Sequence, residues 1–363
     1  MKRVYLYAYD STNFGDDLFI RAIVRRYPEV KFLMWTNHDI KKTFSREKNL
    51  KIYDNNSKLM QLMGKVRGSF PARYKTLQEK MCNASVYIGG SIFMEYPNWE
   101  YTVNWWNGKA ENYKCFAIGC NFGPYKTEEY KNKIETVFTK MSDVCFRDSY
   151  SYNLFKSCSI VRYAPDILFG YPMPESRIVK NQIFVSVIDC SGKDEAHNLQ
   201  EFDEFYTSQM ADILTKYITN GCTIILSSFC KAEGDERSIQ KILEHIHTDD
   251  KDSIIQLNYD GTNDNEILKA ISESEYVIGS RFHAVIMALA AGRPVLPIIY
   301  SDKTSHVLED IGFNGVVFDI RKRQVLSYEE SRYNWDHPQQ IDIESLKKHS
   351  VDHFSVLDKM LKG

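Results

Sequence analysis

Short apolar runs alternate with amphipathic stretches along most of this chain. Residues 4–8 form an apolar run of strand length, residues 14–27 place apolar side chains at helical spacing, and residues 30–35 form a second apolar run. Parallel strands produce this alternation, because each needs a crossover segment, usually a helix, to return the chain to the same end of the sheet. The pattern therefore predicts an α/β fold with a parallel sheet.

The same alternation continues as far as residue 163. In chain order, we expect a strand at 85–88, a helix after residue 92, a strand at 115–118, a helix over 128–141, a strand at 144–146, a helix from residue 149 and a strand at 160–163. The stretch 37–80 is more polar and irregular, and there we expect only short elements.

A cluster of proline and glycine interrupts the pattern near the middle of the chain. It consists of Pro165, Gly170, Pro172 and Pro174. Such clusters mark linkers between domains, and 363 residues are more than one core usually serves. We therefore expect a first domain over residues 1–174, a second over residues 175–330, and a helical tail over residues 331–363 that packs back on the rest.

Strand and helix patterns alternate again in the second half. We expect strands at residues 183–188, 223–226, 254–257, 276–278, 295–298 and 316–318, with helices over 202–219, 235–247, 265–272, 285–290 and 305–311. The two halves therefore predict two doubly wound, Rossmann-like domains of similar size, and we expect them to face each other across a cleft.

The composition excludes several classes of partner and site. Lysine and arginine total 46 against 48 acidic residues, so no basic surplus favours nucleic acid. No apolar run approaches bilayer length, and the N-terminus lacks the pattern of a signal peptide. We therefore expect a cytoplasmic protein with at most peripheral contact with the inner face of a membrane. The eight scattered cysteines contain no C-x-x-C pair, which favours free buried thiols over a zinc site.

The strongest candidate chemistry lies where the strand at 276–278 ends. Gly279, Ser280, Arg281 and His283 occupy the turn before the next helix. Ligands of open α/β sheets bind outside the carboxyl ends of strands, and the free N–H groups at a helix start attract anions. Polar residues at a helix start often only cap the helix. A purely structural interpretation, in which Arg281 caps the helix and His283 is a hydrogen-bonded core residue, therefore explains the motif equally well.

A further cation follows the next strand along the chain. Lys303 comes after the strand at 295–298, which should bring it close to Arg281 and His283. Two cations and a helix start at one place favour a phosphate site, whereas an exposed lysine without a ligand is the alternative.

Two glycine-containing motifs follow strands of the first half. Gly15 and the pair Gly89 and Gly90 let a ligand approach the backbone, and Asn13 and Asp16 offer hydrogen-bond partners to sugar hydroxyls. An ordinary helix start and a tight turn explain the same residues. Neither G-x-G-x-x-G nor a P-loop is present, which disfavours a standard dinucleotide or nucleoside triphosphate site.

Arg147 follows the strand at 144–146 and precedes a helix. Its planar fork of N–H groups suits a carboxylate or a phosphate, with Asp148 as helix cap or orienting partner, and a salt bridge within the turn is the alternative. The aromatic stretch 93–106 alternates with amide and acidic side chains, a pattern typical of a carbohydrate site or of a subunit interface.

These motifs belong to an ordered set that spans nearly the whole chain. The set comprises Asn13-x-Gly15-Asp16, Gly89-Gly90-Ser91, Phe146-Arg147-Asp148-Ser149, Ala164-Pro165-Asp166, Gly279-Ser280-Arg281-Phe282-His283-Ala284, Ala291-Gly292-Arg293-Pro294, Tyr300 and Asp302-Lys303. Each motif is short, but their order resembles the polysaccharide pyruvyl transferase family. Ser91 stands where the family often has a third glycine.

The resemblance implies a GT-B-like fold and the transfer of pyruvate from phosphoenolpyruvate to sugar hydroxyls of a surface or capsular polysaccharide, as a ketal. It assigns Arg147, Arg281, Lys303 and Ser280 to the donor and gives His283, together with Arg281, a catalytic role. Phosphoenolpyruvate, with its carboxylate and phosphate, is then a donor substrate, so we expect no metal and no other cofactor.

The first domain would then hold the sugar acceptor, through Asn13, Asp16, Gly89 and Gly90. A nucleotide-linked acceptor and a lipid-linked acceptor both fit this assignment. Two other functions stay open at this point, because a fold does not determine a function. One is a GT-B sugar-nucleotide glycosyltransferase, with Glu309 or Asp310 as the ribose-binding acid, and the other is a non-catalytic sugar-binding protein of a polysaccharide locus.

Overall fold

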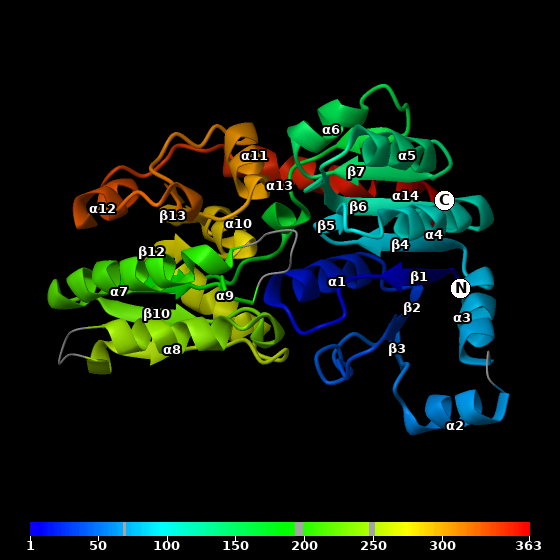
Figure 1. The fold of residues 1–363 in the computed structure, drawn as a ribbon, viewed down its shortest axis with the longest axis horizontal. Helices are drawn as coiled ribbons and strands as arrows, with labels where there is room; N and C mark the ends of the chain where they lie inside the picture. Colours follow the sequence, from blue (N-terminus) through cyan, green and yellow to red (C-terminus); the bar gives the residue numbers. More distant parts are fainter. Residues whose placement is uncertain (68–69, 193–198, 247–250) are drawn as a thin grey trace. The chain divides into compact units, whose positions relative to one another are not determined.

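A computed structural model describes most of the chain (Figure 1). The described residues are 1–67, 70–192, 199–246 and 251–363. They divide into two compact units, each with its own sheet. The first unit comprises Met1–Ser11, Asp16–Ile167 and His349–Gly363, and the second comprises Thr12–Gly15 and Leu168–Lys348.

The first unit is built on an eight-stranded parallel sheet. Its main path is β3-β2-β1-β4-β6-β7-β8, and β5 pairs with β6. The strands are β1 (Arg3–Tyr7), β2 (Lys31–Thr36), β3 (Leu50–Asp54), β4 (Ala84–Ile88), β5 (Ser91–Phe93), β6 (Cys115–Phe122), β7 (Asp143–Phe146) and β8 (Val161–Tyr163). Strands β4, β6 and β7 are buried along their whole length, as parallel strands covered on both faces must be.

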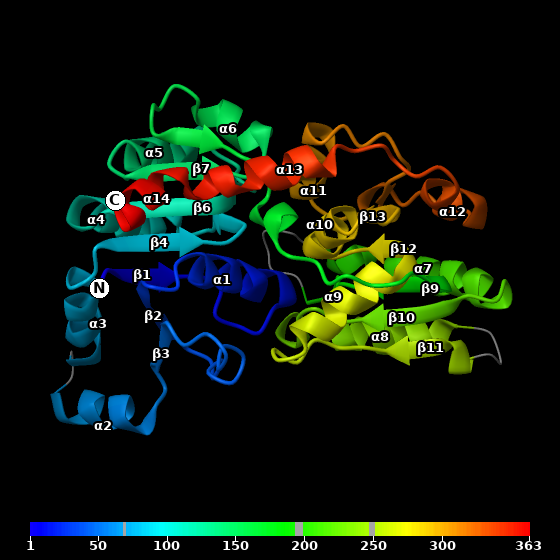
Figure 2. The same cartoon turned by 180° about the vertical axis from the view of Figure 1, so that it is seen from behind.

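Helices cover both faces of this sheet. They include α1 (Phe14–Arg26), α4 (Trp99–Asn112), α5 (Glu128–Phe138), α6 (Ser149–Phe155) and the C-terminal α14 (Ser355–Lys362). Helices α4, α5 and α6 pack on β6 and β7 in one apolar cluster that contains Trp106, Phe138 and Phe155. Figure 1 shows α4 and α5 in front of the sheet, and Figure 2, the reverse view, shows α1 and α14 on its other side.

The stretch 37–80 is more regular than its sequence indicates. Besides β3 it contains the helices α2 (Lys58–Arg67) and α3 (Phe70–Lys80), so the expectation of only short elements was wrong. Contacts with distant residues stabilise this segment. The indole of Trp35 donates a hydrogen bond to Gln78 Oε1 at 2.6 Å, and its ring stacks on Tyr53 with centroids 5.0 Å apart. Such tertiary packing overrides a weak local helical pattern.

The second unit is built on a six-stranded parallel sheet of order β11-β10-β9-β12-β13-β14. The strands are β9 (Val179–Ser186), β10 (Thr223–Ser227), β11 (Ile254–Gln256), β12 (Ser274–Gly279), β13 (Val295–Ile299) and β14 (Phe318–Asp319). Register at the centre pairs Gly279 of β12 with Ser186 of β9. The carboxyl ends of these two strands therefore lie side by side.

Helices also cover both faces of the second sheet. They are α7 (Asp203–Thr219), α8 (Asp235–His245), α9 (Asp264–Glu273), α10 (Phe282–Ala290), α11 (Asp302–Asp310), α12 (Tyr328–Asp336) and α13 (Ile343–Ser350). Figure 1 shows α7 and α8 in front of this sheet, whereas α9 is in front of it in Figure 2. The expectation of two doubly wound, Rossmann-like units is therefore confirmed.

The C-terminal residues are shared between the two units. Helices α12 and most of α13 group with the second unit, and residues 349–363 group with the first. In the first unit His353 is fully buried, and its Nδ1 accepts the backbone N–H of Gly119 at 3.2 Å. Its Nε2 donates to the carbonyl of Pro165 at 3.0 Å, so this side chain ties the C-terminal segment to strand β6 and to the loop after β8.

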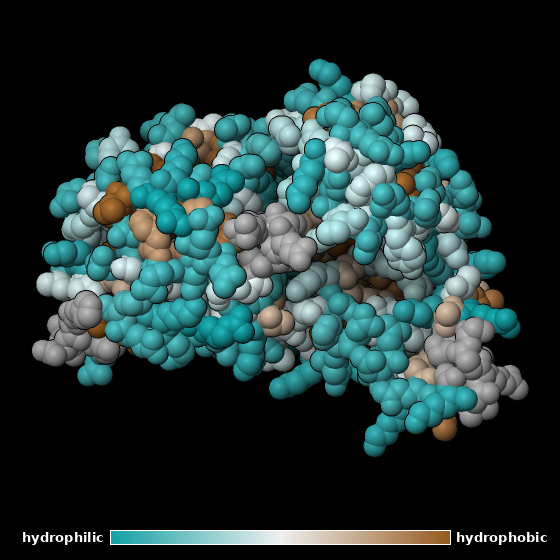
Figure 3. All heavy atoms as spheres, viewed as in Figure 1, coloured by the Kyte–Doolittle hydropathy of each residue, from teal (hydrophilic) through white to brown (hydrophobic). Residues whose placement is uncertain are grey.

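All eight cysteines are free and seven of them are buried, as the sequence predicts. Within the described part of the chain, no helix is both long enough and apolar enough to span a bilayer. Figure 3 shows one face of the molecule, on which hydrophilic residues predominate and hydrophobic residues form small separate groups.

Candidate active site

The turn after β12 carries Ser280, Arg281 and His283 at the carboxyl edge of the second sheet. Arg281 has an extended backbone (φ −82°, ψ 131°) and directly precedes α10. The buried hydroxyl of Ser186, at the end of neighbouring β9, accepts the backbone N–H groups of Ser280 and Arg281, each at 3.1 Å. Two hydrogen bonds to one side chain therefore fix this turn to the centre of the sheet.

Two carboxylates hold the guanidinium of Arg281, which is almost fully buried. Its Nε donates to Asp235 Oδ2 at 2.9 Å, its Nη2 donates to Asp235 Oδ1, and its Nη1 donates to Glu233 Oε2 at 2.6 Å. Burial by itself lowers the pKa of Arg281, but the two carboxylates outweigh it and raise that pKa well above its ordinary value. Arg281 therefore keeps its positive charge in a buried position.

Asp235 and Glu233 are site residues that sequence reasoning missed. Asp235 is the first residue of α8, is fully buried, and also accepts the backbone N–H groups of Phe229 at 2.9 Å and Cys230 at 3.0 Å. An acidic residue at a helix start usually serves the helix dipole, so nothing distinguished these two. The available signal was their position just after β10, whose carboxyl end lies at the same sheet edge.

His283 lies on the first turn of α10 and is partly exposed. Gly15, which belongs to the same unit, lies against its ring, and a β-carbon on Gly15 would stand 1.7 Å from His283 Nδ1. The N–H of Gly15 donates to Asn13 Oδ1 at 3.1 Å, and Asn13 Nδ2 donates to Glu233 Oε1 at 3.4 Å. The structure thus brings Asn13, Gly15, Arg281 and His283 together in the second unit.

Ser280 and Lys303 follow the adjacent strands β12 and β13. The hydroxyl of Ser280 is buried, 2.8 Å from the hydroxyl of Tyr206 on α7. Lys303 is the second residue of α11, and its Nζ lies 5.4 Å from the ring centroid of Tyr300. Tyr300 is also close enough to Arg281 to contribute to its raised pKa. Lys303 and Arg281 therefore follow neighbouring strands at one edge of this sheet.

In the first unit Arg147 is buried at the end of β7. Its Nη1 donates to Asp166 Oδ2 at 3.1 Å, and its Nη2 donates to Asn121 Oδ1 at 2.8 Å. A β-carbon on Gly90 would stand 2.6 Å from Arg147 Nη2, so the guanidinium occupies the space beside this glycine. Three of the predicted motifs therefore meet in one buried cluster, and the role of Arg147 toward a donor stays a prediction.

Asp16 and Gly89 also lie together in the first unit. Gly89 has a positive φ of 151°, and a β-carbon on it would stand 3.9 Å from Asp16 Oδ1. Only glycine adopts this backbone readily, which explains the residue type at the end of β4. Asp148 is a helix cap, since its side chain accepts the N–H of Ser151 at 2.7 Å.

The aromatic stretch 93–106 divides between core and surface. Phe93 and Trp106 are buried in the cluster beneath α4 and α5. Tyr101 is 77% exposed and Trp105 is 37% exposed. Some aromatic residues of this stretch therefore serve the core, and only the exposed ones can contact a sugar or a partner.

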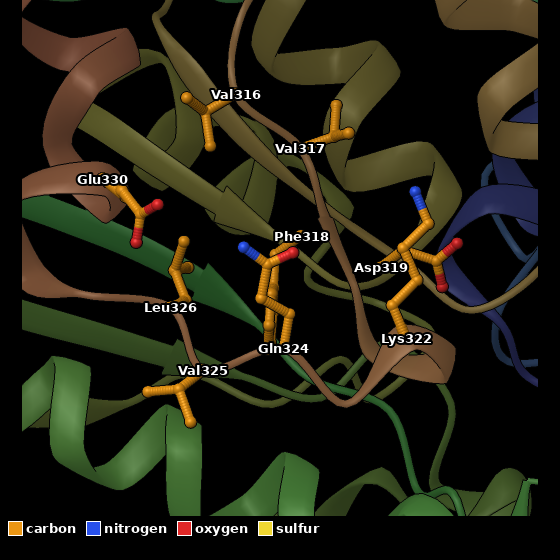
Figure 4. A pocket seen from close by; sticks show the side chains of 9 residues that line it. All are labelled: Val316, Val317, Phe318, Asp319, Lys322, Gln324, Val325, Leu326 and Glu330. Carbon is orange, nitrogen blue, oxygen red and sulfur yellow. The ribbon is translucent and has the colours of Figure 1, made fainter.

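Two surface pockets of the second unit lie apart from these residues. One has Val316, Phe318 and Leu326 in its apolar lining, with the polar side chains of Lys322 and Glu330 on opposite sides (Figure 4). The other is lined by Leu289, Gly292, Arg293, Pro294, Val295, Phe313, Asn334, Pro338, Gln339, Ile341 and Ile343. Neither contains the predicted site residues. Among the residues that the structure describes, no three His, Cys, Asp or Glu side chains are arranged to hold a metal ion.

Arg281 and His283 in the second unit can together bind an anion and transfer a proton. A guanidinium that keeps its charge can bind a carboxylate or a phosphate. An imidazole on the same helical turn can accept or donate a proton near neutral pH. The arrangement therefore suits a reaction in which an anionic substrate gains or loses a proton.

Solved structures with the same fold come from several sugar-active proteins. UDP-GlcNAc 2-epimerase from Neisseria meningitidis, solved with UDP-GlcNAc, has a TM-score of 0.62 at 10% identity, and the match covers 100% of each chain. Anabaena Alr3699/HepE, solved with UDP and glucose, has a TM-score of 0.55 at 11% identity, covering 100% of this chain and 97% of that one. These similarities confirm the GT-B-like fold class.

Sequence comparison identifies the family. The amylovoran biosynthesis protein AmsJ of Erwinia amylovora is 21% identical in an alignment 263 residues long that covers 67% of this chain and 62% of AmsJ. The match therefore spans less than two thirds of that relative's length. The sequence profile of the polysaccharide pyruvyl transferases matches residues 13–302, a segment that runs from Asn13 through Arg281 and His283 to Asp302. The chain therefore belongs to the polysaccharide pyruvyl transferase family.

Proposed function

We propose that this protein transfers pyruvate from phosphoenolpyruvate to two hydroxyls of a sugar in a surface or capsular polysaccharide, forming a cyclic ketal. The observation that carries the proposal is the pairing of Arg281 and His283 on one helix start, with Gly15 against the imidazole. Family membership and the similarity to a protein of amylovoran biosynthesis support the same reaction class.

Arg281 and Lys303 are the proposed ligands of the donor. Phosphoenolpyruvate carries a carboxylate and a phosphate on a small frame, and both groups pair well with guanidinium and ammonium groups. The two cations follow the adjacent strands β13 and β12 of one sheet, which supports a common anionic ligand. Ser280 would contribute through the turn that its buried hydroxyl stabilises, and Arg147 is assigned to the donor by its family motif.

His283 is the proposed acid and base. A proton added to the methylene carbon of phosphoenolpyruvate leaves an oxocarbenium-like carbon, and the first sugar hydroxyl attacks it and loses its proton. The C–O bond to phosphate then breaks, and the second hydroxyl closes the ketal and releases its proton to phosphate. The balance is one phosphoenolpyruvate and one diol to one ketal and one inorganic phosphate.

The proposed acceptor residues are Asn13, Asp16, Gly89 and Gly90. Asn13 and Asp16 offer hydrogen-bonding groups to hydroxyls, and Gly89 and Gly90 place no side chain at the end of β4. A nucleotide-linked sugar and a lipid-linked sugar are both candidates, and each is to be supplied in the assay.

The test is a reaction of the purified protein with phosphoenolpyruvate and a panel of acceptor sugars. Release of inorganic phosphate that depends on the acceptor, together with a pyruvate ketal in the product's NMR spectrum, would support the proposal. Thermal shift provides a second readout, because a ligand that binds the native state stabilises it. Stabilisation by UDP-sugars or GDP-sugars but not by phosphoenolpyruvate would refute the proposal in favour of a glycosyltransferase.

A further inference from the structure

The two carboxylates that hold Arg281 share its guanidinium unequally. Asp235 takes the edge formed by Nε and Nη2 with both of its oxygens. Glu233 takes Nη1, at 2.6 Å. Three of the five N–H groups are thereby engaged, so an incoming carboxylate or phosphate that binds Nη1 through its second N–H group would lie beside the carboxylate of Glu233.

The surroundings of the two acids show which one is fixed. The side chain of Asp235 is 0% exposed, and two backbone N–H groups, of Phe229 and Cys230, hold the oxygen that also accepts from Arg281 Nε. Glu233 lies on a single helical turn, Lys231–Glu233, and its side chain is 26% exposed. Its contact with Asn13 Nδ2 is long, at 3.4 Å. Glu233 can therefore move at much lower cost than Asp235.

The charges of the group disfavour an added anion. One guanidinium and two carboxylates sum to one net negative charge, and Arg281 and Asp235 are largely shielded from water. Phosphoenolpyruvate at Arg281 Nη1 would meet the carboxylate of Glu233 at close range. Movement of Glu233 away from Nη1 removes that repulsion and leaves both N–H groups of Nη1 to the anion.

We propose that Glu233 is an internal substitute for the anionic donor, which the donor's carboxylate or phosphate displaces from Arg281 Nη1, while Asp235 stays bound and positions the guanidinium. Glu233 thereby sets the affinity of the site for anions. The identification of the anion as phosphoenolpyruvate rests on the proposed function, whereas the displacement of Glu233 by an anion does not.

The test compares anion binding by the wild type, Glu233→Gln and Glu233→Ala. Isothermal titration with inorganic phosphate and, separately, with phosphoenolpyruvate gives the dissociation constants. Both variants remove the competing charge, so each should bind anions about tenfold more tightly than the wild type. Glu233→Ala also removes the side-chain amide. It therefore tests the proposal even if the Glu233→Gln protein does not fold or its amide still binds Nη1.

Glu236→Gln is the matched control. Glu236 lies three residues further along, pairs with Lys231 at 3.3 Å, and has a side chain that is 36% exposed. It carries the same charge change without a contact to Arg281. Unchanged anion affinity in this control, together with tighter binding in the Glu233 variants, assigns the effect to the Arg281 contact rather than to net charge.

Steady-state kinetics distinguish the proposed role of Glu233 from a purely structural one, because a structural role would not change KM separately from kcat. We expect Glu233→Gln to lower the KM for phosphoenolpyruvate about tenfold without raising kcat, because it strengthens ground-state binding. Unchanged or weaker binding of both anions in the Glu233 variants, or no anion binding by any of the proteins, overturns the proposal. Tighter phosphate binding without any turnover of phosphoenolpyruvate would leave Glu233 in its proposed role and refute the proposed function instead.

Discussion

Gly15 and His283 fit together so closely that the imidazole occupies the space of a missing side chain. A β-carbon on Gly15 would stand 1.7 Å from His283 Nδ1 and 2.4 Å from its Cγ. No real β-carbon approaches another atom so closely, so Gly15→Ala must displace the ring or the loop that carries Asn13. A displacement of about 1 Å at a reacting group costs about 100-fold in rate. We therefore expect Gly15→Ala to lower kcat about 100-fold in the phosphate-release assay.

Gly108→Ala is the control for this substitution. Gly108 lies within α4, and a β-carbon there would meet no atom within 4 Å. Alanine at an open helical position stabilises a protein by about 0.5–1 kcal/mol, so activity should be unchanged and Tm slightly raised. Full activity of Gly15→Ala would mean that the position of His283 is irrelevant to turnover.

A second prediction concerns the buried pair of Arg147 and Asp166. The side chains are 2% and 0% exposed, so Asp166→Asn removes a carboxylate that pairs with a buried guanidinium. Loss of one member of a buried pair costs about 3 kcal/mol or more, because the remaining charge is neither solvated nor compensated. We expect this decrease in the free energy of unfolding, measured by urea denaturation at neutral pH.

The comparison for that measurement is an exposed pair. Arg332 and Asp336 lie one helical turn apart on α12, with side chains 36% and 43% exposed. Asp336→Asn should cost less than about 1 kcal/mol, because solvent screens such a pair. Equal losses in the two variants would contradict the role assigned to burial at Arg147.

The third prediction is a pH dependence of stability that arises from His353. Burial lowers its pKa from 6.5 to about 3 in the folded protein. The unfolded chain therefore binds a proton below pH 6.5 that the folded chain does not bind until about pH 3. The contribution to stability is complete above pH 6.5 and is lost as the pH falls, at about 1.4 kcal/mol per pH unit.

The check on His353 is urea denaturation of the wild type and of His353→Gln between pH 7 and pH 4. Glutamine does not titrate in this range, so the variant should show a shallower loss of stability on acidification. The two unfolding free energies should therefore approach each other as the pH falls. A difference that stays constant over this range would show that His353 does not titrate on unfolding.

The sequence was sufficient to predict where the candidate residues lie. Arg147, Arg281 and Lys303 each directly follow or lie close to the end of a parallel strand, and such ends share one edge of a sheet. The partners of these residues could not be predicted in the same way. Asp235 and Glu233 are 46 and 48 residues from Arg281, and pairing over such a separation depends on side-chain packing rather than on local pattern.

Local pattern also failed where tertiary contacts decide the structure. Helices α2 and α3 follow a polar stretch with weak periodicity, and packing around Trp35 stabilises part of that segment. The C-terminal residues behave similarly, because the buried contacts of His353 are made with Gly119 and Pro165, far away in the sequence. Short-range propensity contains no information about such contacts.

The last prediction tests the proposed acid and base directly. General acid and base catalysis contributes about 100-fold to 10,000-fold, so His283→Gln should lower kcat by about 1,000-fold. Arg281 and Lys303 remain in this variant, and we therefore expect phosphoenolpyruvate to bind with an unchanged dissociation constant in titration calorimetry. His337→Gln makes the same chemical change at an exposed histidine at the end of α12 and should leave both quantities unaltered. The opposite result would be weaker phosphoenolpyruvate binding by His283→Gln together with a wild-type kcat at saturating phosphoenolpyruvate. It would identify His283 as a ligand of the donor instead of the group that moves the proton.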